Sequence, residues 1–428
     1  MAGEHPLRRS LGLHDAVAIG LGSMIGAGVF AVWAPAAATA GPWLLLSLAL
    51  AAFVAACNAL SSAALAVRYP TAGGTYVYGR ERLGDLPGYL AGWCFVIGKV
   101  ASCAAMAMTV GAYLVPEYER VSALVAVVVV TLLNLSGVQR SAGMSRVIVT
   151  AVLAVLAGVV VAALLRGAGG PGWSGGVGDG TVGGGSYAVL QAAGLLFFAF
   201  AGYARIATLA EEVEHPERVI PRAVTLSLTV VLVVYAAVGI TLLGVIGAER
   251  VAGSSAPVAE LAEQVWGSSW SWLVRVAAGV AALGALLNLV LGISRTSMAM
   301  ARGGHLPAAL GRIGRRHQTP RVAEIVVGVV VLGVVLVADL RGAIGFSSFG
   351  VLLYYAIANA SAWTLRGDWG AARLVPPLGL AGCLTLALTL PWGSVLGGAG
   401  LIAVGLLWYA VRGSFGVGRA TRSGPSAG

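Results

Sequence analysis

Long apolar stretches alternate along the chain with short segments that hold most of the charged, proline and glycine residues. Several stretches run for about 20 residues or more, the length that a helix rising about 1.5 Å per residue needs to cross a hydrocarbon core of about 30 Å. The pattern therefore predicts an all-α polytopic membrane protein with about twelve transmembrane helices. We place these spans near 15–39, 41–67, 88–115, 121–139, 147–165, 187–210, 220–247, 269–294, 322–338, 343–365, 374–390 and 396–411.

The composition strengthens this interpretation. Of the 428 residues, 58% are hydrophobic and 10% are charged, and the mean hydropathy is +0.88. Soluble domains are only about 45–50% apolar. The 62 glycines also fit, because glycine is commoner in membrane helices than in soluble ones and lets helices approach closely.

The positions of the basic residues predict the orientation in the membrane. An even number of spans places both termini on one side. If that side is the cytoplasm, most of the 27 lysine and arginine residues lie in cytoplasmic segments. By the positive-inside rule we expect a multi-pass protein of the cytoplasmic (inner) membrane with both termini in the cytoplasm. Five basic residues then lie outside, namely Arg120, Arg166, Arg250, Arg275 and Arg341.

A Gly-rich, nearly uncharged segment divides the chain into two halves. It covers about 167–186 and is predicted to be a flexible external linker. Five spans precede it, five follow, and two more come last. The predicted organisation is a cytoplasmic tail (1–14), a five-helix repeat (15–166), the linker, a second five-helix repeat (187–365), helices 11 and 12 (366–412) and a second cytoplasmic tail (413–428).

Span 1 contains a run of glycines that weakens it at its centre. Four glycines lie between Gly20 and Gly28, and each costs a helix about 1 kcal/mol relative to alanine. If the helix unwinds there, free backbone N–H groups and the positive end of the next half-helix can hold a carboxylate. Alternatively, Gly22-x-x-x-Gly26 is only a close-packing groove for a neighbouring helix. The residues of span 1 leave both interpretations open.

Span 6 occupies the corresponding position in the second half. It contains Phe197-Phe198-Ala199-Phe200-Ala201-Gly202-Tyr203, with a pair of small residues at its middle. Interrupted helices at matching positions of two halves are the best sequence indication of a transporter's central site. Phe198 would then cover the substrate as a lid, or serve only as packing.

Other classes of function find little support. The basic residues are scattered singly, so we expect no nucleic-acid partner. The four cysteines lie in apolar stretches without a C-x-x-C pair, and the five histidines lie at or outside span ends. We therefore expect no metal, no cofactor and no enzyme activity. A channel would need a continuous polar pore, for which the spans hold too few ionisable residues.

Five motifs in order resemble the amino acid–polyamine–organocation permeases, which share the inverted-repeat fold of bacterial leucine transporters. They are G-S-M-I-G-A-G-V-F at 22–30, P-T-A-G-G-T-Y-V-Y at 70–78, L-N-L-S-G-V at 133–138, the E-E…H-P-E-R…I-P-R segment at 211–222, and S-R…M-A-R…L-P at 294–307. The resemblance covers most of the chain and implies a 5+5 inverted repeat with discontinuous helices 1 and 6.

The resemblance also implies a function and a site. It points to a secondary active transporter that moves an amino acid or related amine by alternating access. The alternatives are an amino acid or polyamine exchanger and a membrane amino acid sensor that does not transport. Family members often carry a glutamate two residues after the span-6 glycine, where this chain has Ala204 followed by Arg205. The implied substrate-binding residues are Ser23, Met24, Ile25, Gly26, Ala27 and Gly28, completed by Phe198, Ala199, Phe200, Ala201 and Gly202.

Lys99 is the only lysine of the chain and lies about eleven residues into span 3, near the middle of the membrane. A charge there costs roughly 2.5–3.5 kcal/mol. One interpretation is structural, in which Lys99 pairs with a carbonyl between helices. A second is that Lys99 gains and loses the coupling proton. A third is that it contacts the substrate carboxylate. Some proton-coupled members of the resembling family use a buried lysine on the fifth span, and here span 5 has none.

Overall fold

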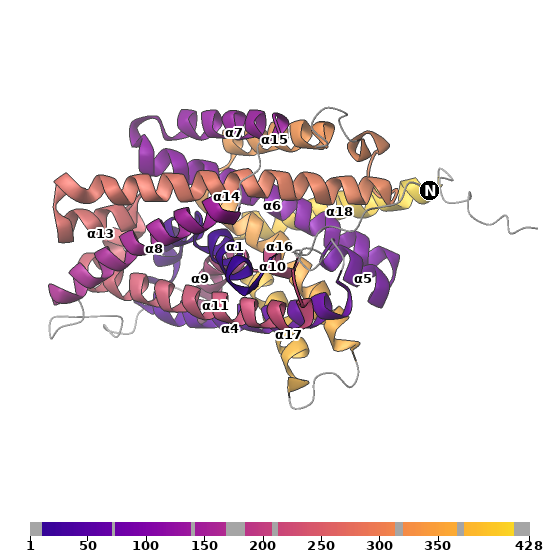
Figure 1. Cartoon of the computed structure of the whole chain (residues 1–428), viewed down its shortest axis with the longest axis horizontal. Helices are drawn as coiled ribbons and strands as arrows, with labels where there is room; N and C mark the ends of the chain where they lie inside the picture. The colour runs from indigo at the N-terminus through magenta and orange to yellow at the C-terminus, as the bar shows by residue number, and fades with distance from the viewer. Residues whose placement is uncertain are drawn as a thin grey trace, which may run out of the picture.

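The computed structural model describes residues 11–70, 73–137, 142–167, 185–207, 213–312, 320–365 and 372–414. Within these residues the chain is helical apart from turns and one isolated bridge between Leu11 and Val213. The predicted linker and the two predicted tails lie almost entirely outside the described residues. The rest of the chain forms a bundle of long helices (Figure 1).

In the described residues of the first half there are eight helices and two short 3-10 turns. They are α1 (Leu13–Ile25), α2 (Gly28–Ala31), α3 (Trp33–Ala40), a turn at Gly41–Trp43, α4 (Leu44–Arg68), α5 (Thr75–Leu83), α6 (Asp85–Leu114), a turn at Pro116–Tyr118, α7 (Glu119–Leu135) and α8 (Ala142–Leu165).

The part of the second half that the structure describes contains ten helices. They are α9 (Gly185–Phe200), α10 (Ala204–Ala207), α11 (Pro216–Thr241) with a π-helical end at Leu242–Ile246, α12 (Ala248–Gly253), α13 (Pro257–Trp266), α14 (Ser268–Arg302), a 3-10 turn at Ala308–Gly311, α15 (Arg321–Val337), α16 (Leu340–Trp363), α17 (Val375–Thr389) and α18 (Trp392–Ser414).

Each of the twelve predicted spans corresponds to one of these helices or to an interrupted series of them. In the described part of the chain, ten segments are long and apolar enough to cross a membrane. The helices at the other two predicted spans are shorter, since α15 has 17 residues and α17 has 15. The chain is thus a multi-pass membrane protein.

Three short helices lie where the sequence predicts only connections between spans. These are α5, α12 and α13. In α13 the residues Val258, Leu261, Ala262 and Val265 are buried at helical spacing, whereas Glu263 is exposed. Such an amphipathic helix covers the end of the bundle and is too short to be found by a search for spans.

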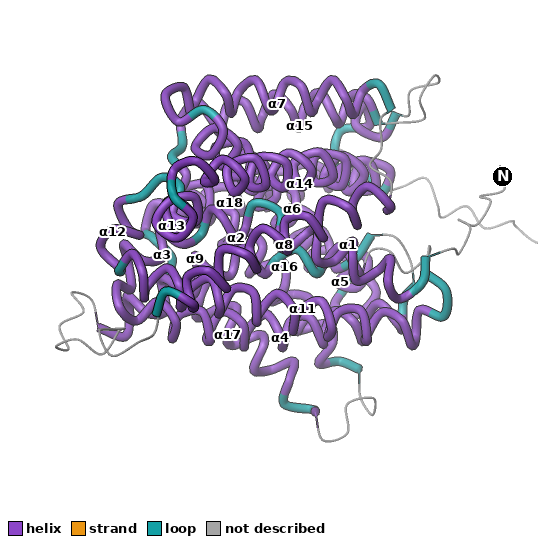
Figure 2. The backbone as a smooth tube through the Cα atoms, turned by 60° about the vertical axis from the view of Figure 1, so that its left-hand side comes forward, coloured by secondary structure: helices purple, strands orange, loops and turns teal. Residues whose placement is uncertain are grey.

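The long helices pack in two groups, one of which contains the interrupted helices α1 and α9. In one group α4 packs against α9 and α11, and α1 packs against α11 and α8. In the other, α6 packs against α14 and α7, and α15 packs against α7 (Figure 2). The two groups also meet through α16, which contacts both α6 and α4. The interrupted helices α1 and α9 therefore lie inside the bundle.

A polar cluster joins the beginning of α6 to α5, to the loop after α14 and to α18. Tyr409 donates a hydrogen bond to Asp85 at 2.9 Å, and His305 Nε2 lies 3.1 Å from the same carboxylate oxygen. On its other side, His305 Nδ1 lies 2.8 Å from the hydroxyl of Tyr76. Burial lowers the pKa of His305, although the Asp85 carboxylate acts in the opposite direction. A neutral ring that donates from Nε2 and accepts at Nδ1 satisfies both contacts.

This cluster predicts a pH-dependent stability. A histidine pKa below its unfolded value of about 6.5 means that the unfolded chain binds the proton first as pH falls, so stability is present above about pH 6.5 and decreases below it. The expected slope is at most about 1.4 kcal/mol per pH unit. Thermal unfolding of the detergent-solubilised protein between pH 7 and pH 5 measures it. His305→Gln should flatten the curve, while the same change at the exposed His14 should not. An unchanged curve in His305→Gln would show that His305 does not titrate in this range.

Candidate functional site

Two helix interruptions lie at the centre of the structure. Helix α1 ends at Ile25 and α2 begins at Gly28, and Gly26 between them has φ −39° and ψ −106°, outside the helical region. Helix α9 ends at Phe200, residues 201–203 form a turn, and α10 begins at Ala204. Both interruptions lie within the segments that the sequence singles out, 23–28 and 199–203.

The backbones of the two interruptions touch because glycine leaves room for them. A Cβ atom added to Gly202 would overlap the backbone of Ser23 and lie 2.7 Å from the nitrogen of Met24. A Cβ added to Gly28 would lie 2.8 Å from the Cα of Ala199. Real Cβ atoms do not approach that closely, so a side chain at either position would push the broken helices apart.

Buried side chains satisfy the carbonyl groups that the interruptions leave without a helical partner. The hydroxyl of Tyr235 donates to the carbonyl of Met24 at 2.7 Å and lies 3.1 Å from that of Ala199. The carbonyl of Ala201 accepts from Lys99 Nζ at 3.1 Å and from the hydroxyl of Tyr355 at 3.4 Å. An orphaned carbonyl in a dry interior costs several kcal/mol, so these contacts are needed to keep the breaks in place.

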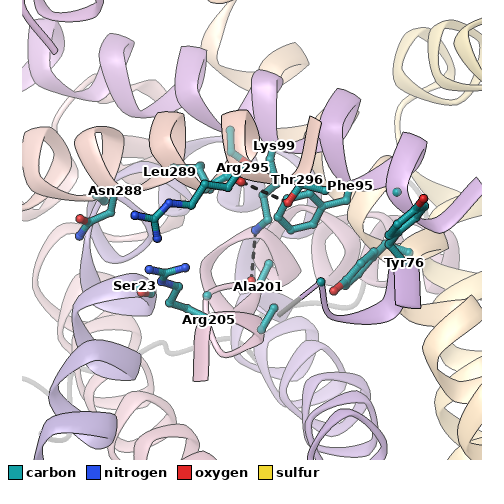
Figure 3. Close-up of a pocket in the computed structure, with 18 of the residues that line it drawn as sticks. Ser23, Tyr76, Phe95, Lys99, Ala201, Arg205, Asn288, Leu289, Arg295 and Thr296 are labelled. Carbon is teal, nitrogen blue, oxygen red and sulfur yellow. Dashed lines mark hydrogen bonds between the residues drawn. The ribbon is translucent and has the colours of Figure 1, made fainter. Parts of the chain in front are cut away.

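A cavity of about 400 Å³ lies beside the two interruptions (Figure 3). This volume falls within the range of about 300–1,000 Å³ that small-molecule sites occupy. Its walls come mainly from α1, α5, α6, the α9–α10 break, α10, α14 and α16. The polar or bulky side chains among its lining include Ser23, Tyr76, Phe95, Lys99, Ser102, Met106, Phe198, Arg205, Asn288, Leu289, Arg295, Thr296, Met298 and Tyr354.

The cavity includes some of the candidate site residues named from the sequence, and others lie behind its wall. Ser23, Lys99, Phe198, Ala201 and Gly202 line it. The remaining seven do not, and these are Met24, Ile25, Gly26, Ala27, Gly28, Ala199 and Phe200.

For two of these seven residues, packing contacts explain why they do not line the cavity. Gly26 faces α14, where an added Cβ would lie 2.6 Å from that of Ala285. The ring of Phe200 packs edge-on against Tyr235 at a centroid distance of 5.2 Å. Close packing therefore accounts for both positions in this conformation.

The cavity wall carries positive charge. Lys99 is 7% exposed, Arg205 is partly buried and Arg295 is exposed, and all three line the cavity. Among the lining residues that the structure describes there is no aspartate or glutamate. The described chain also contains no group of three His, Cys, Asp or Glu side chains that could hold a metal ion.

Sequence reasoning expects span 8 to contribute to the site but names no cavity residue of α14, which forms that span. Asn288, Gly292 and Arg295 recur at i, i+4 and i+7, so they lie on one face of this helix. A polar stripe in an otherwise apolar span is a detectable signal, because membrane helices place polar side chains toward the protein interior or a water-filled cavity. The spacing could have shown which face of span 8 lines the site.

Comparison with known proteins identifies the family. Residues 11–415 match the family described as amino acid permease. The chain belongs to the amino acid permease family. An uncharacterized transporter of Mycobacterium bovis is 57% identical to this permease over 408 residues, which cover 95% of this chain and 92% of the relative. An uncharacterized transporter of Mycobacterium tuberculosis matches to the same extent.

More distant relatives carry substrate names. A branched-chain amino acid permease of Bacillus subtilis is 26% identical over 443 residues, covering 95% of this chain and 94% of the relative. A chloroplastic cationic amino acid transporter of Arabidopsis thaliana is 27% identical over 454 residues, covering 95% and 76% respectively. The family and these relatives are transporters and not enzymes, so the resemblance seen in the motifs is confirmed, and the permease is a multi-pass membrane transporter of amino acids.

The contact between the two breaks predicts the effect of a single methyl group. In Gly202→Ala the added Cβ overlaps the backbone of Ser23, so the broken helices must separate. Overpacking of this kind costs about 1–3 kcal/mol, and we expect a lower unfolding temperature together with reduced amino acid uptake into proteoliposomes.

The matched control is Gly292→Ala, which also lies in the cavity wall but whose Cβ would meet nothing within 4 Å. This variant should keep its stability. Equal stability and equal uptake in both variants would contradict the close contact between the breaks.

Proposed function

We propose that the permease is a proton-coupled secondary active transporter that moves an amino acid across the cytoplasmic membrane by alternating access. The observation that carries this proposal is the pair of broken helices whose backbones touch at the edge of a small-molecule cavity. Discontinuous helices of this kind supply helix ends and unwound backbone to a central substrate site. The surrounding apolar surface contacts membrane lipids.

The packing of the helices supports a 5+5 inverted repeat. If the halves are 15–166 and 187–365, the two halves give five pairs of corresponding helices. In four of these pairs the two helices pack against each other, namely α1 with α9, α4 with α11, α6 with α14, and α7 with α15. Helices α17 and α18 would then be the two that follow the repeats. The leucine-transporter-like arrangement predicts this pairing.

The cavity supports an inward-open state. On one side Arg295 is exposed, and Gly202 and Arg205 are partly exposed. On the other side Phe30 and Tyr113 are buried, with ring centroids 5.5 Å apart, and the Tyr113 hydroxyl donates to the carbonyl of Phe30 at 3.1 Å. Under the orientation given by the positive-inside rule, the closed side faces outward and both termini lie in the cytoplasm.

We assign the substrate's α-carboxylate to the break in span 1, between Ser23 and Gly28. No backbone acceptor is found in the described chain for the N–H groups of Gly26 and Ala27. They precede a half-helix whose N-terminal end favours negative charge. Only Ser23 of this segment lines the cavity in the present conformation, so the proposal includes a movement of α1 that brings these N–H groups to the carboxylate. Phe198 lies in the wall where it can cover the substrate.

Lys99 is our candidate for proton coupling. It is buried, and its single hydrogen bond goes to the carbonyl of Ala201 in the span-6 break. In the described residues no carboxylate forms an ion pair with it. A buried ammonium held by a neutral carbonyl costs energy, so its protonation responds when the break moves and its surroundings change. Lys99 is thus a titratable group in direct contact with the span-6 break, which moves in the proposed cycle.

The proposal predicts how Lys99→Met behaves. This variant keeps most of the side-chain length but removes the charge and the bond to Ala201. In proteoliposomes, wild-type uptake of the transported amino acid should increase when an inward proton gradient is imposed. The variant should lose this response and still exchange internal for external substrate.

Two results decide between the alternatives. Accumulation with unchanged pH dependence in Lys99→Met would assign Lys99 a structural role. Binding of an amino acid without any uptake by the wild-type protein would favour the sensor function and contradict transport. As a control, Ser102→Ala removes a neighbouring polar group of α6 in the same wall and should leave the response to the proton gradient intact.

A further inference from the structure

A buried histidine lies directly behind one end of the cavity wall. The side chain of His305 is 1% exposed, and its Nδ1 lies 2.8 Å from the hydroxyl of Tyr76. Tyr76 lines the cavity, and Figure 3 shows it at the opposite end from Asn288. On its other side, His305 Nε2 lies 3.1 Å from the carboxylate of Asp85. Under the orientation proposed above, this end of the cavity faces the cytoplasm.

The groups around His305 carry charges of both signs. Burial is the largest effect and lowers the pKa of His305, the guanidinium groups of Arg412 and Arg80 act in the same direction, and the Asp85 carboxylate acts against them. The ring is therefore neutral near pH 7 and becomes charged in acid. In the described chain, the titratable or charged groups that face it are Tyr76 and Arg80 of α5, Asp85 and Tyr89 of α6, and Tyr409 and Arg412 of α18.

Protonation of His305 reverses one hydrogen bond. The neutral ring donates from Nε2 to Asp85, so its Nδ1 accepts from the hydroxyl of Tyr76. In the charged ring both nitrogens donate. The hydroxyl proton of Tyr76 moves to Nδ1 and a proton from cavity water replaces it on the phenol oxygen. The phenol stays neutral, the ring gains one positive charge, and the contact with Asp85 is kept.

Two glycines hold the ring of Tyr76 in place during this change. A Cβ atom added to Gly303 would lie 2.5 Å from the hydroxyl of Tyr76, and one added to Gly92 would lie 2.9 Å from its ring. The ring therefore has little room to swing, and the new hydroxyl proton has to point away from His305. Since Tyr76 lines the cavity, the protonation of His305 reaches the cavity as a changed hydrogen-bond donor.

The changed donor affects closure of the cavity. While His305 is neutral, it accepts the hydroxyl proton of Tyr76, and this bond does not depend on water in the cavity. Once His305 is charged, that proton depends on cavity water, which is lost when the cytoplasmic end closes. A buried donor without an acceptor is unfavourable, so the charged ring opposes closure.

We propose that His305 is a positioning residue that binds a proton from the cytoplasmic side, sets the hydrogen bonding of Tyr76, and slows the transport cycle when the cytoplasm becomes acidic. This inference rests on the proposed function, because it requires a cavity that closes on its cytoplasmic side. In a transporter that carries protons inward, this response limits further acidification.

The test measures amino acid exchange by the purified full-length protein in proteoliposomes. The vesicles contain an unlabelled mixture of the standard L-amino acids, and a radiolabelled mixture is added outside. A protonophore keeps the pH equal on both sides, so the orientation of the protein does not matter. We expect the wild-type exchange rate to fall at least about threefold between about pH 7.5 and about pH 5.5, and to recover when the pH is raised again.

Four variants assign the response to its residues. Gln accepts and donates hydrogen bonds without titrating, so His305→Gln should exchange at a rate that is nearly independent of pH in this range. Tyr76→Phe has no hydroxyl to turn and should also lose the response. The same change at the exposed His14, His14→Gln, should keep it. Lys99→Met should keep it as well, which separates His305 from the proposed coupling residue.

The outcomes separate this inference from the function on which it rests. A lower exchange rate in His305→Gln with the wild-type pH profile would make His305 structural and overturn the inference. Retention of the acid response in Tyr76→Phe would show that His305 does not act through Tyr76, and would also overturn it. Exchange of no amino acid by folded wild-type protein at any pH would contradict the transport function itself. Folding of each variant is checked by size-exclusion chromatography and thermal unfolding in detergent.

Discussion

A helix that is interrupted inside a membrane protein leaves backbone N–H and C=O groups that lipid cannot satisfy. This constraint governs the centre of the permease. The interruption in span 6 is held by Lys99 and Tyr355, which both donate to the carbonyl of Ala201, and the span-1 carbonyl of Met24 accepts from Tyr235. These donors come from α6, α16 and α11, so the three helices that surround the breaks also stabilise them. A movement of either break must exchange these hydrogen bonds for others.

Glycine makes the same region compact. Gly202 and Gly28 let the two interruptions meet backbone to backbone, without an intervening side chain. Each break therefore forms part of the environment of the other. Lys99 donates its hydrogen bond to one of these breaks. In the function that we propose, the substrate binds at the breaks and Lys99 carries the proton, so this contact would give the coupling between them a short physical route.

Much of this architecture could be predicted from local sequence. The glycine run at 20–28 alone leaves a break and a packing groove both open, but the Ala201-Gly202 pair at the matching position of the second half favours breaks in both spans. Span length is set by the apolar pattern. The ends of α15 and α17, and the short helices α5, α12 and α13, depend on packing that no single stretch encodes. The residues that line the cavity were harder to predict. Arg205 was visible only as a departure from the family pattern, and Tyr235 and Tyr355 act through contacts with segments far away in the chain.

In the mechanism that we propose, the cavity beside the two breaks is the substrate site and opens to one side of the membrane at a time. Gly292→Cys tests it, because Gly292 lines the cavity, its Cβ position is open, and the four native cysteines are buried. A membrane-impermeant maleimide should label this cysteine in inside-out vesicles, and the amino acid that is taken up fastest should protect it. Labelling of equal rate with and without a saturating concentration of that amino acid would contradict the account.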